Sequence, residues 1–180
     1  MVIKFLKHIK TVLKHKWAVF KLCVRAGIVW QGIVHDLSKF SIEELKESLK
    51  FYDDGKRSPL AIAKEKKGYS LAWLHHAGRN KHHYQYWYDY EAPNPTPQMP
   101  YKYVVEMICD SMAAGMTYQG KNWTKEYQLS YWNRTKERAK ITMELRNMLD
   151  DVYSEIAEKG IKPVINKKRL KELYNKNFNK

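Results

Sequence analysis

Cysteine is scarce in this sequence, and long uninterrupted apolar runs are missing. Only two of the 180 residues are cysteine, Cys23 and Cys109, and they lie far apart without a CxxC pair. This usage does not support a disulfide framework like that of secreted domains, so we expect a cytoplasmic protein. The most apolar early stretch, residues 17–34, is interrupted by Lys21 and Arg25, which is too much charge for a membrane span or signal core. We therefore expect no transmembrane segment.

Acidic residues are missing from one end of the chain and rare at the other. Residues 1–35 hold seven Lys or Arg and no acid, while residues 161–180 hold seven against the single Glu172, so the two ends carry nearly all of the net charge of +14. Such ends suggest attraction to a polyanion: nucleic acid, a phosphorylated substrate or an anionic membrane surface. Simple solubility is the alternative, and the charge pattern does not separate the two.

Runs that alternate apolar and polar residues are also missing, so no β-strand is expected. A chain of 180 residues with 44% hydrophobic residues fits one domain with a real core. We expect an all-α, single-domain helical bundle over residues 1–160, followed by a loosely held basic tail at residues 161–180.

Apolar residues at three- and four-residue steps predict a first helix. Gly27 and Gly32 mark a break, and residues 28–36 either begin a second helix or extend the first after a turn. The stripe consists of Ile3, Leu6, Ile9, Leu13, Trp17, Phe20 and Val24. Ser41 is expected to cap a helix that ends near residue 52, and Ser70 to cap another.

Proline and glycine mark the remaining boundaries. Pro59 opens a helical stretch that ends near Gly68. Four prolines in the segment EAPNPTPQMP, residues 91–100, predict a loop. A helix is expected to resume at residue 101, and a last long helix is expected over residues 125–159.

Histidine is concentrated in one short segment. Four of the seven histidines fall within HHAGRNKHH, residues 75–83. Imidazole is the commonest protein ligand for divalent transition metals, and nitrogen with carboxylate oxygen suits iron, manganese, zinc, nickel or cobalt. A solvated basic loop is the alternative, but the flanking aromatic residues favour a partly buried metal site.

The order of the other candidate ligands along the chain is informative. His15 is followed by the dipeptide His35-Asp36, then by the histidine pairs, and finally by Asp110 on an apolar helical stretch. This order resembles the HD-domain superfamily of all-helical, metal-dependent phosphohydrolases, and HDLSK is similar to the HD-x-x-K form of its motif. More narrowly, HDLSKFS, HHAGRNKHHYQYW and EMICDSMAAG resemble a family of short bacterial and phage proteins whose name gives no function.

The resemblance implies a set of ligands. It makes His15, His35, Asp36 and Asp110 the ligands of one divalent ion and assigns the intermediate histidines to a second ion or to substrate. Adjacent histidines on a regular helix point about 100° apart, so a whole pair is not expected to face one ion. Among His75, His76, His82 and His83 the sequence does not decide, and we favour His76 and His82.

Two cations lie within the same motifs. Lys39 and Arg79 are candidate catalytic residues that would neutralise phosphate charge, although each could be an ordinary surface charge. The expected function is a metal-dependent phosphohydrolase acting on a nucleotide or another small phosphorylated compound, with one or two divalent ions. The alternatives are an HD-fold di-iron oxygenase, and a non-catalytic protein with a structural metal that binds nucleic acid through its basic ends. The sequence does not indicate the oligomeric state.

Overall fold

The structure, a computed structural model, describes residues 2–178, and the regular secondary structure of these residues is entirely helical. No strand occurs in these residues, and the expected all-α class is confirmed. The α-helices are α1 (Val2–Ala26), α2 (Val29–Val34), α3 (Ile42–Phe51), α4 (Pro59–Lys67), α5 (Leu71–Arg79), α6 (Tyr101–Gln119), α7 (Tyr127–Thr135), α8 (Met143–Lys159), α9 (Ile161–Val164) and α10 (Lys167–Phe178). Short 3-10 helices are η1 (Leu37–Phe40), η2 (Tyr84–Trp87), η3 (Gly120–Asn122) and η4 (Lys136–Arg138).

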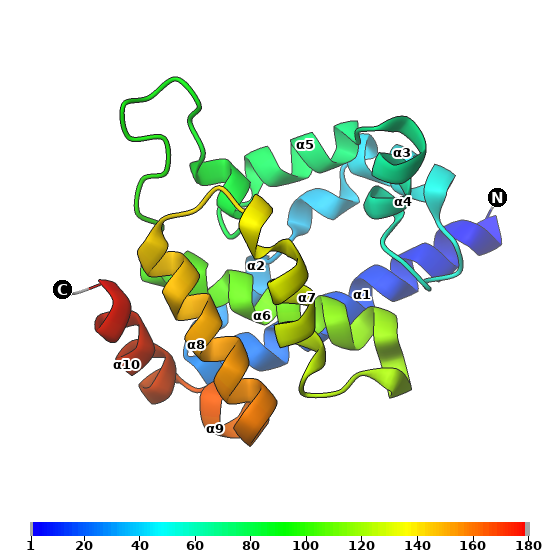
Figure 1. The fold of residues 1–180 in the computed structure, drawn as a ribbon. Helices are drawn as coiled ribbons and strands as arrows, with labels where there is room; N and C mark the ends of the chain where they lie inside the picture. Colours follow the sequence, from blue (N-terminus) through cyan, green and yellow to red (C-terminus); the bar gives the residue numbers. More distant parts are fainter. Residues whose placement is uncertain (1, 179–180) are drawn as a thin grey trace.

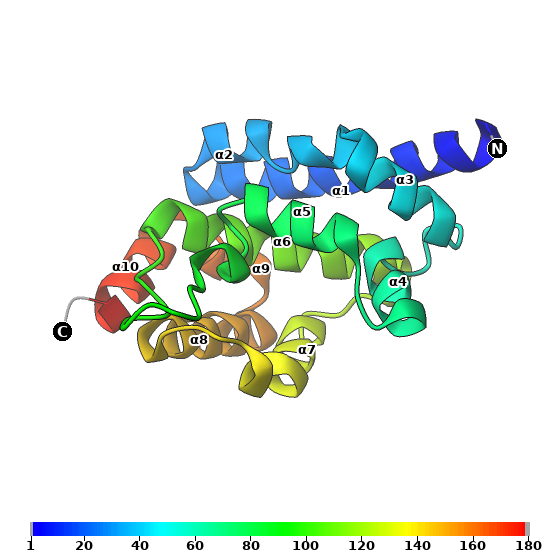
Figure 2. The ribbon, with the colours of Figure 1, turned by 90° about the horizontal axis from the view of Figure 1, so that it is seen from above.

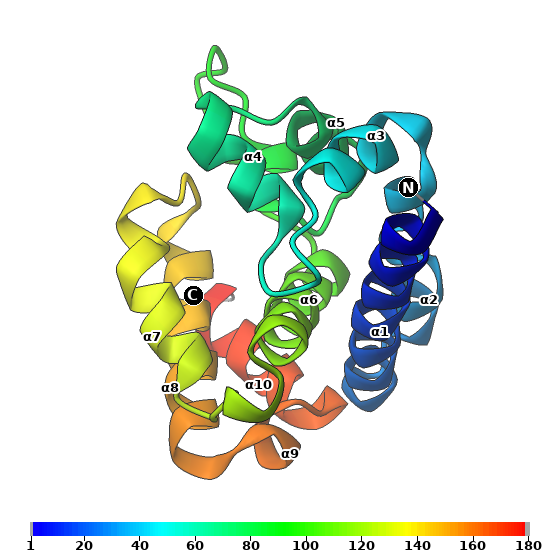
Figure 3. The same ribbon diagram turned by 90° about the vertical axis from the view of Figure 1, so that its right-hand side faces the viewer.

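Helix α6 is the central element (Figure 1). It lies between α1 with α2 on one side and α7 with α8 on the other, while α3, α4 and α5 form a third group beside it (Figure 3). Its buried side chains surround most of its circumference, which is the pattern of a helix enclosed by a core. The core is continuous from Val19 on α1 through Ile108 on α6 to Ile156 on α8.

Local signals fix the ends of several helices as predicted. The side chain of Ser41 accepts a hydrogen bond from the backbone N–H of Glu44, and that of Ser70 accepts one from Trp73. Pro59 stands at the start of α4, and Gly68 ends it in the left-handed conformation that glycine tolerates best. The proline-rich segment lies in the loop between η2 and α6.

The break between the first two helices is tightly packed. Gly27 adopts φ +76° just after α1, and α2 then runs back alongside α1 (Figure 2). A Cβ atom placed on Gly32 would lie 2.8 Å from Cys23 Cβ and 3.2 Å from Phe20 Cα. Glycine therefore permits the two helices to approach each other, and this approach positions the residues that follow α2.

The predicted apolar stripe of α1 does not face the core. Most of its members are exposed, whereas the buried face of the helix carries His8, Val12, His15, Val19, Leu22, Cys23 and Ala26. Helix α1 packs on α6 through this second face, which includes two histidines. Cys23 and Cys109 are both buried and free.

Two expectations about the C-terminal third are wrong. The expected single helix over residues 125–159 is divided into α7 and α8, because Thr142 caps a new helix by accepting a hydrogen bond from the N–H of Leu145. The division lets α7 and α8 pack together, with Trp132 donating to Asp150 at 2.8 Å. The segment 161–178 is not a loose tail but forms α9 and α10.

Apolar contacts hold α10 in place despite its basic composition. Leu170, Leu173 and Tyr174 are buried against the core, and Arg169 pairs with Glu155 of α8. The expectation for residues 179–180 lies outside the described part of the chain. None of the helices in residues 2–178 combines the length and apolar character that crossing a bilayer demands.

Candidate metal centre

The structure brings all the predicted ligands into one buried region. The site lies where α1, the α2–η1 junction, the end of α5 with the turn after it, and α6 meet. The predicted ligands in this region are His15, His35, Asp36, His76, His82 and Asp110, and the structure adds His83. They form two overlapping groups, in each of which the candidate ligand atoms lie within 4.8 Å of one another, and His35 and His82 form a third such group with Glu106.

The first group consists of His15, His35, Asp36 and Asp110. Nε2 of His15 lies 3.0 Å from Oδ1 of Asp110, and Nε2 of His35 lies 3.2 Å from Oδ2 of Asp36. Two imidazole nitrogens and two carboxylates therefore face one point. Their donor set matches that of a divalent transition-metal site.

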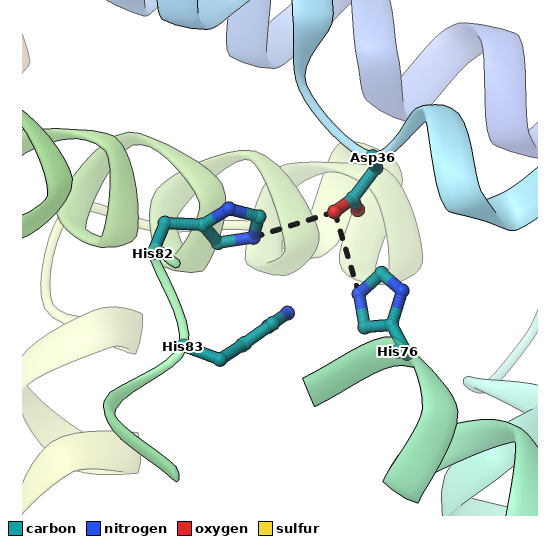
Figure 4. A group of neighbouring side chains, drawn as sticks. All are labelled: Asp36, His76, His82 and His83. Atoms are coloured by element: carbon teal, nitrogen blue, oxygen red, sulfur yellow. Dashed lines mark ion pairs between the residues drawn. The ribbon is translucent and has the colours of Figure 1, made fainter. Parts of the chain in front are cut away.

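The second group consists of Asp36, His76, His82 and His83 (Figure 4). Nε2 of His76 and Nε2 of His82 each lie 3.3 Å from Oδ1 of Asp36. The His83 ring lies 4.7 Å from that of His76 and 4.3 Å from that of His82, measured between ring centroids. Because residues 82 and 83 follow the end of α5 rather than lying on a regular helix, the argument that only one histidine of a pair can face an ion does not apply to them.

Asp36 belongs to both groups, and its two oxygens are divided between them. Oδ2 faces His35 of the first group, whereas Oδ1 faces His76 and His82 of the second. The backbone of Asp36 has φ 53° and ψ 34°, a left-handed conformation that costs energy for a residue with a side chain but is most accessible to Asp and Asn. This bend ends α2 and lets consecutive residues, His35 and Asp36, both face the site.

Several ligand atoms have no hydrogen-bond partner within the described residues although they are buried. They are Nε2 of His15, His35, His82 and His83, and Oδ1 of Asp36. Buried polar atoms are nearly always hydrogen-bonded, so a converging set of orphaned nitrogens and an orphaned carboxylate oxygen is unusual. The residues present thus fit a metal centre, because coordination would satisfy these atoms together.

A carboxylate that sequence reasoning missed holds two of the histidines. Glu106 of α6 is buried, and its Oε1 lies 3.0 Å from Nδ1 of His35 and 3.1 Å from Nδ1 of His82. Burial opposes its ionisation, but hydrogen bonds from these two histidines hold the pKa of Glu106 below its usual value. A carboxylate at Nδ1 fixes the ring so that Nε2 points into the site, which is the usual support for a metal-binding histidine. The available signal was a glutamate inside the apolar run VVEMIC.

Glu44 of α3 holds His76, a histidine of the second group, in the same way. Its Oε2 lies 2.8 Å from Nδ1 of His76, and its Oε1 lies 3.0 Å from Nδ1 of His75. His75 therefore contacts Glu44 rather than the central group. The sequence alone does not single out Glu44, because its contacts depend on packing between α3 and α5 that the sequence does not specify.

The two candidate catalytic cations differ in position. The ammonium group of Lys39 pairs with Oδ2 of Asp36 while its side chain stays 25% exposed. Burial alone would lower the pKa of Lys39, but the charges of Asp36 and Asp110 raise it, so the group stays charged. Arg79 is exposed, and within residues 2–178 it makes no hydrogen bond or ion pair with the central group.

The pKa values of His82 and His83 are shifted in opposite directions. Burial would lower the pKa of His82, but the nearby carboxylates of Asp36 and Glu106 raise it to about 9. For His83, burial and the neighbouring charge of His82 lower the pKa well below its usual value. His83 therefore offers a free imidazole nitrogen, whereas His82 must lose a proton before it can bind an ion.

Comparison with known proteins identifies the family of the chain. A family model described as "Family of unknown function (DUF5662)" matches residues 4–155, a range that includes every ligand named above. No curated protein and no solved structure matches the chain.

Proposed function

The chain belongs to the DUF5662 family. From its site we propose that it is a metal-dependent phosphohydrolase in which two groups of side chains would each hold a divalent ion, with Asp36 common to both groups. One observation carries the proposal: the two oxygens of a single buried carboxylate face two separate sets of histidines. A bridging carboxylate is a means of holding two ions close together, and two-ion sites are typical of enzymes that act on phosphate esters.

Each ion has its own ligands in this proposal. His15, His35 and Asp110 would hold the first ion, and the histidines at 76, 82 and 83 would hold the second. The order of these residues along the chain resembles that of the HD-domain superfamily, and we propose that the chain is a divergent relative of that group. Glu106 contacts His35 of the first group and His82 of the second, and so fixes the position of the two groups relative to each other.

The chemistry follows from the ions and the charges around them. Divalent ions in such a site activate water for attack and polarise a phosphoryl group. Lys39 places a positive charge beside Asp36 and remains partly exposed, so an incoming phosphate oxygen can contact it. The net charge of +14 attracts anionic compounds over a longer range. These features support a nucleotide or another small phosphorylated compound as substrate.

Phosphate release tests the proposal directly. The full chain, freed of metal and reloaded separately with manganese, cobalt, nickel, zinc or iron, is assayed against a panel of nucleotides and sugar phosphates. At least one ion should support release, and Asp36→Ala should abolish it. Glu155→Gln is the matched control, because Glu155 pairs with Arg169 far from the site.

Two experimental outcomes would contradict the proposal and show a different function. Oxygen consumption by an iron-loaded protein that releases no phosphate would identify an oxygenase. Steeply salt-dependent binding to nucleic acid that persists in Asp36→Ala, without any phosphate release, would identify a binding protein.

A further inference from the structure

Helices α1 and α2 carry a row of exposed apolar side chains on the outer side of the molecule. We call this row the α1–α2 face, and it consists of Leu6, Leu13, Trp17, Val24, Trp30 and Ile33, all of them exposed. The four residues on α1 recur at spacings of seven, four and seven, so they lie along one side of the helix. Trp17 and Trp30 are 59% and 67% exposed, which is unusual for large aromatic residues.

Helix α2 lies against α1 (Figures 2 and 3). Lys16 donates a hydrogen bond to the backbone carbonyl of Ile33, and Gly32 packs on Phe20, which stacks on Trp17 with ring centroids 5.5 Å apart. The exposed apolar residues of α2 therefore belong to a helix that is packed beside those of α1. Exposed apolar surface on two adjoining helices indicates an interaction site.

Basic side chains line one side of the row. Lys10, Lys14 and Lys21 are exposed at spacings of four and seven, next to the apolar residues on the helix surface. Within residues 2–178, none of these three lysines pairs with a carboxylate. Residues 1–35 contain no acid at all. The face thus combines apolar anchors with unpaired positive charge.

This charge selects among possible partners. A second copy of the chain docking through the same face would bring lysines against lysines, with no acid on either helix to pair with them. A nucleic acid would match the lysines but would leave the tryptophans without apolar contact. An anionic lipid surface satisfies both features, because its headgroups attract lysine and its boundary layer accepts apolar and tryptophan side chains.

We propose that the α1–α2 face binds an anionic bilayer surface, with α1 and α2 lying in the plane of the lipid headgroups. This binding does not span the bilayer. It uses exposed residues of the two helices, whereas His15 lies on the buried side of α1 and His35, which directly follows α2, is also buried, so it is independent of the metal centre.

Cosedimentation with lipid vesicles tests the proposal. The full chain is incubated with vesicles of phosphatidylcholine alone or of phosphatidylcholine and phosphatidylglycerol in equal parts. Partitioning onto the anionic vesicles should be at least about tenfold stronger and should weaken with salt. The double substitution Leu13→Ser with Trp17→Ser should reduce it about tenfold or more, and so should Lys10→Gln with Lys14→Gln and Lys21→Gln.

Met143→Ser is the matched control, since Met143 is 64% exposed at the start of α8 and away from this face. It should partition like the unaltered protein. Equal partitioning of the Leu13/Trp17 variant would overturn the proposal, as would the absence of binding to anionic vesicles. A dimer that sedimentation velocity detects in the unaltered protein and not in that variant would overturn it too, because a second copy would then cover the face.

Discussion

The carboxylate oxygen Oε1 of Glu106 lies 3.0 Å from Nδ1 of His35, and the same oxygen lies 3.1 Å from Nδ1 of His82. The two histidines belong to different halves of the candidate metal centre, and their rings stand 4.5 Å apart between centroids. One buried side chain therefore sets the orientation of a ligand in each half.

Glu106→Gln should weaken binding of both ions. An amide can still hydrogen-bond to an imidazole, but it lacks the negative charge that makes the ring a stronger ligand, and such changes typically cost 10- to 100-fold in metal affinity, or about 1.4–2.8 kcal/mol. Calorimetric titration of the metal-free protein measures the change. Glu155→Gln should leave the affinity unaltered, and an equal loss in both variants would show that Glu106 has no special role.

His83 and His75 are sequence neighbours of the favoured ligands, but we expect their substitution to change metal affinity by different amounts. Nε2 of His83 is buried, unpartnered and close to His76 and His82, whereas Nδ1 of His75 hydrogen-bonds to Glu44. We expect His83→Ala to weaken one of two bound ions at least about tenfold and His75→Ala to change affinity less. Metal stoichiometry at limiting ion concentration distinguishes them, and full occupancy in His83→Ala would remove that residue from the ligand set.

Gly32→Ala should destabilise the protein although it adds only a methyl group. The new Cβ would lie 2.8 Å from Cys23 Cβ and close to Phe20 backbone, so α2 must move away from α1, at a cost of about 1–3 kcal/mol. Gly78 on α5 is the matched control, because a Cβ there meets nothing within 4 Å. Gly78→Ala should be neutral or stabilising by up to about 1 kcal/mol. Thermal unfolding of the two variants decides the point, and equal melting temperatures would contradict the packing argument.

Metal binding should strengthen as pH rises. The pKa of His82 in the metal-free protein is raised to about 9, so below pH 9 its ring is protonated and an incoming ion must displace that proton. Between pH 7 and 9 the apparent affinity should increase by about tenfold per pH unit from this group alone, then level off above 9. Titrations with manganese at several pH values measure the slope, and a flat profile would mean that His82 is not a ligand.

Local sequence signals predicted the helical class and many helix boundaries. Ser41, Ser70, Pro59 and Gly68 act within one turn of their own position, so their effects can be read without knowledge of the fold. The sequence pattern does not predict the division between α7 and α8, because Thr142, which caps α8, lies inside a long polar stretch. The expectation of a loosely held tail at residues 161–180 is wrong for residues 161–178. It rests on the basic composition of this segment, whereas Leu170 and Leu173 within it pack on the core.

The candidate site was only partly predictable for a different reason. The resemblance to a known motif order singled out His15, His35, Asp36 and Asp110, which the structure brings together. Glu44 and Glu106 act through histidines that are distant in sequence, so only the packing of helices identifies them. The apolar stripe of α1 has helical periodicity, but periodicity alone does not reveal which of two faces meets the core.

Anomalous X-ray diffraction from crystals soaked in manganese or loaded with iron tests the central claim most directly. The account predicts two anomalous peaks, one on each side of the Asp36 carboxylate, with the first near His15 and Asp110 and the second near His76. Crystals of Asp36→Asn should lose at least one peak while the helices stay in place. The absence of any peak at Asp36, or two full peaks in Asp36→Asn, would contradict the proposal that this carboxylate bridges a two-ion centre.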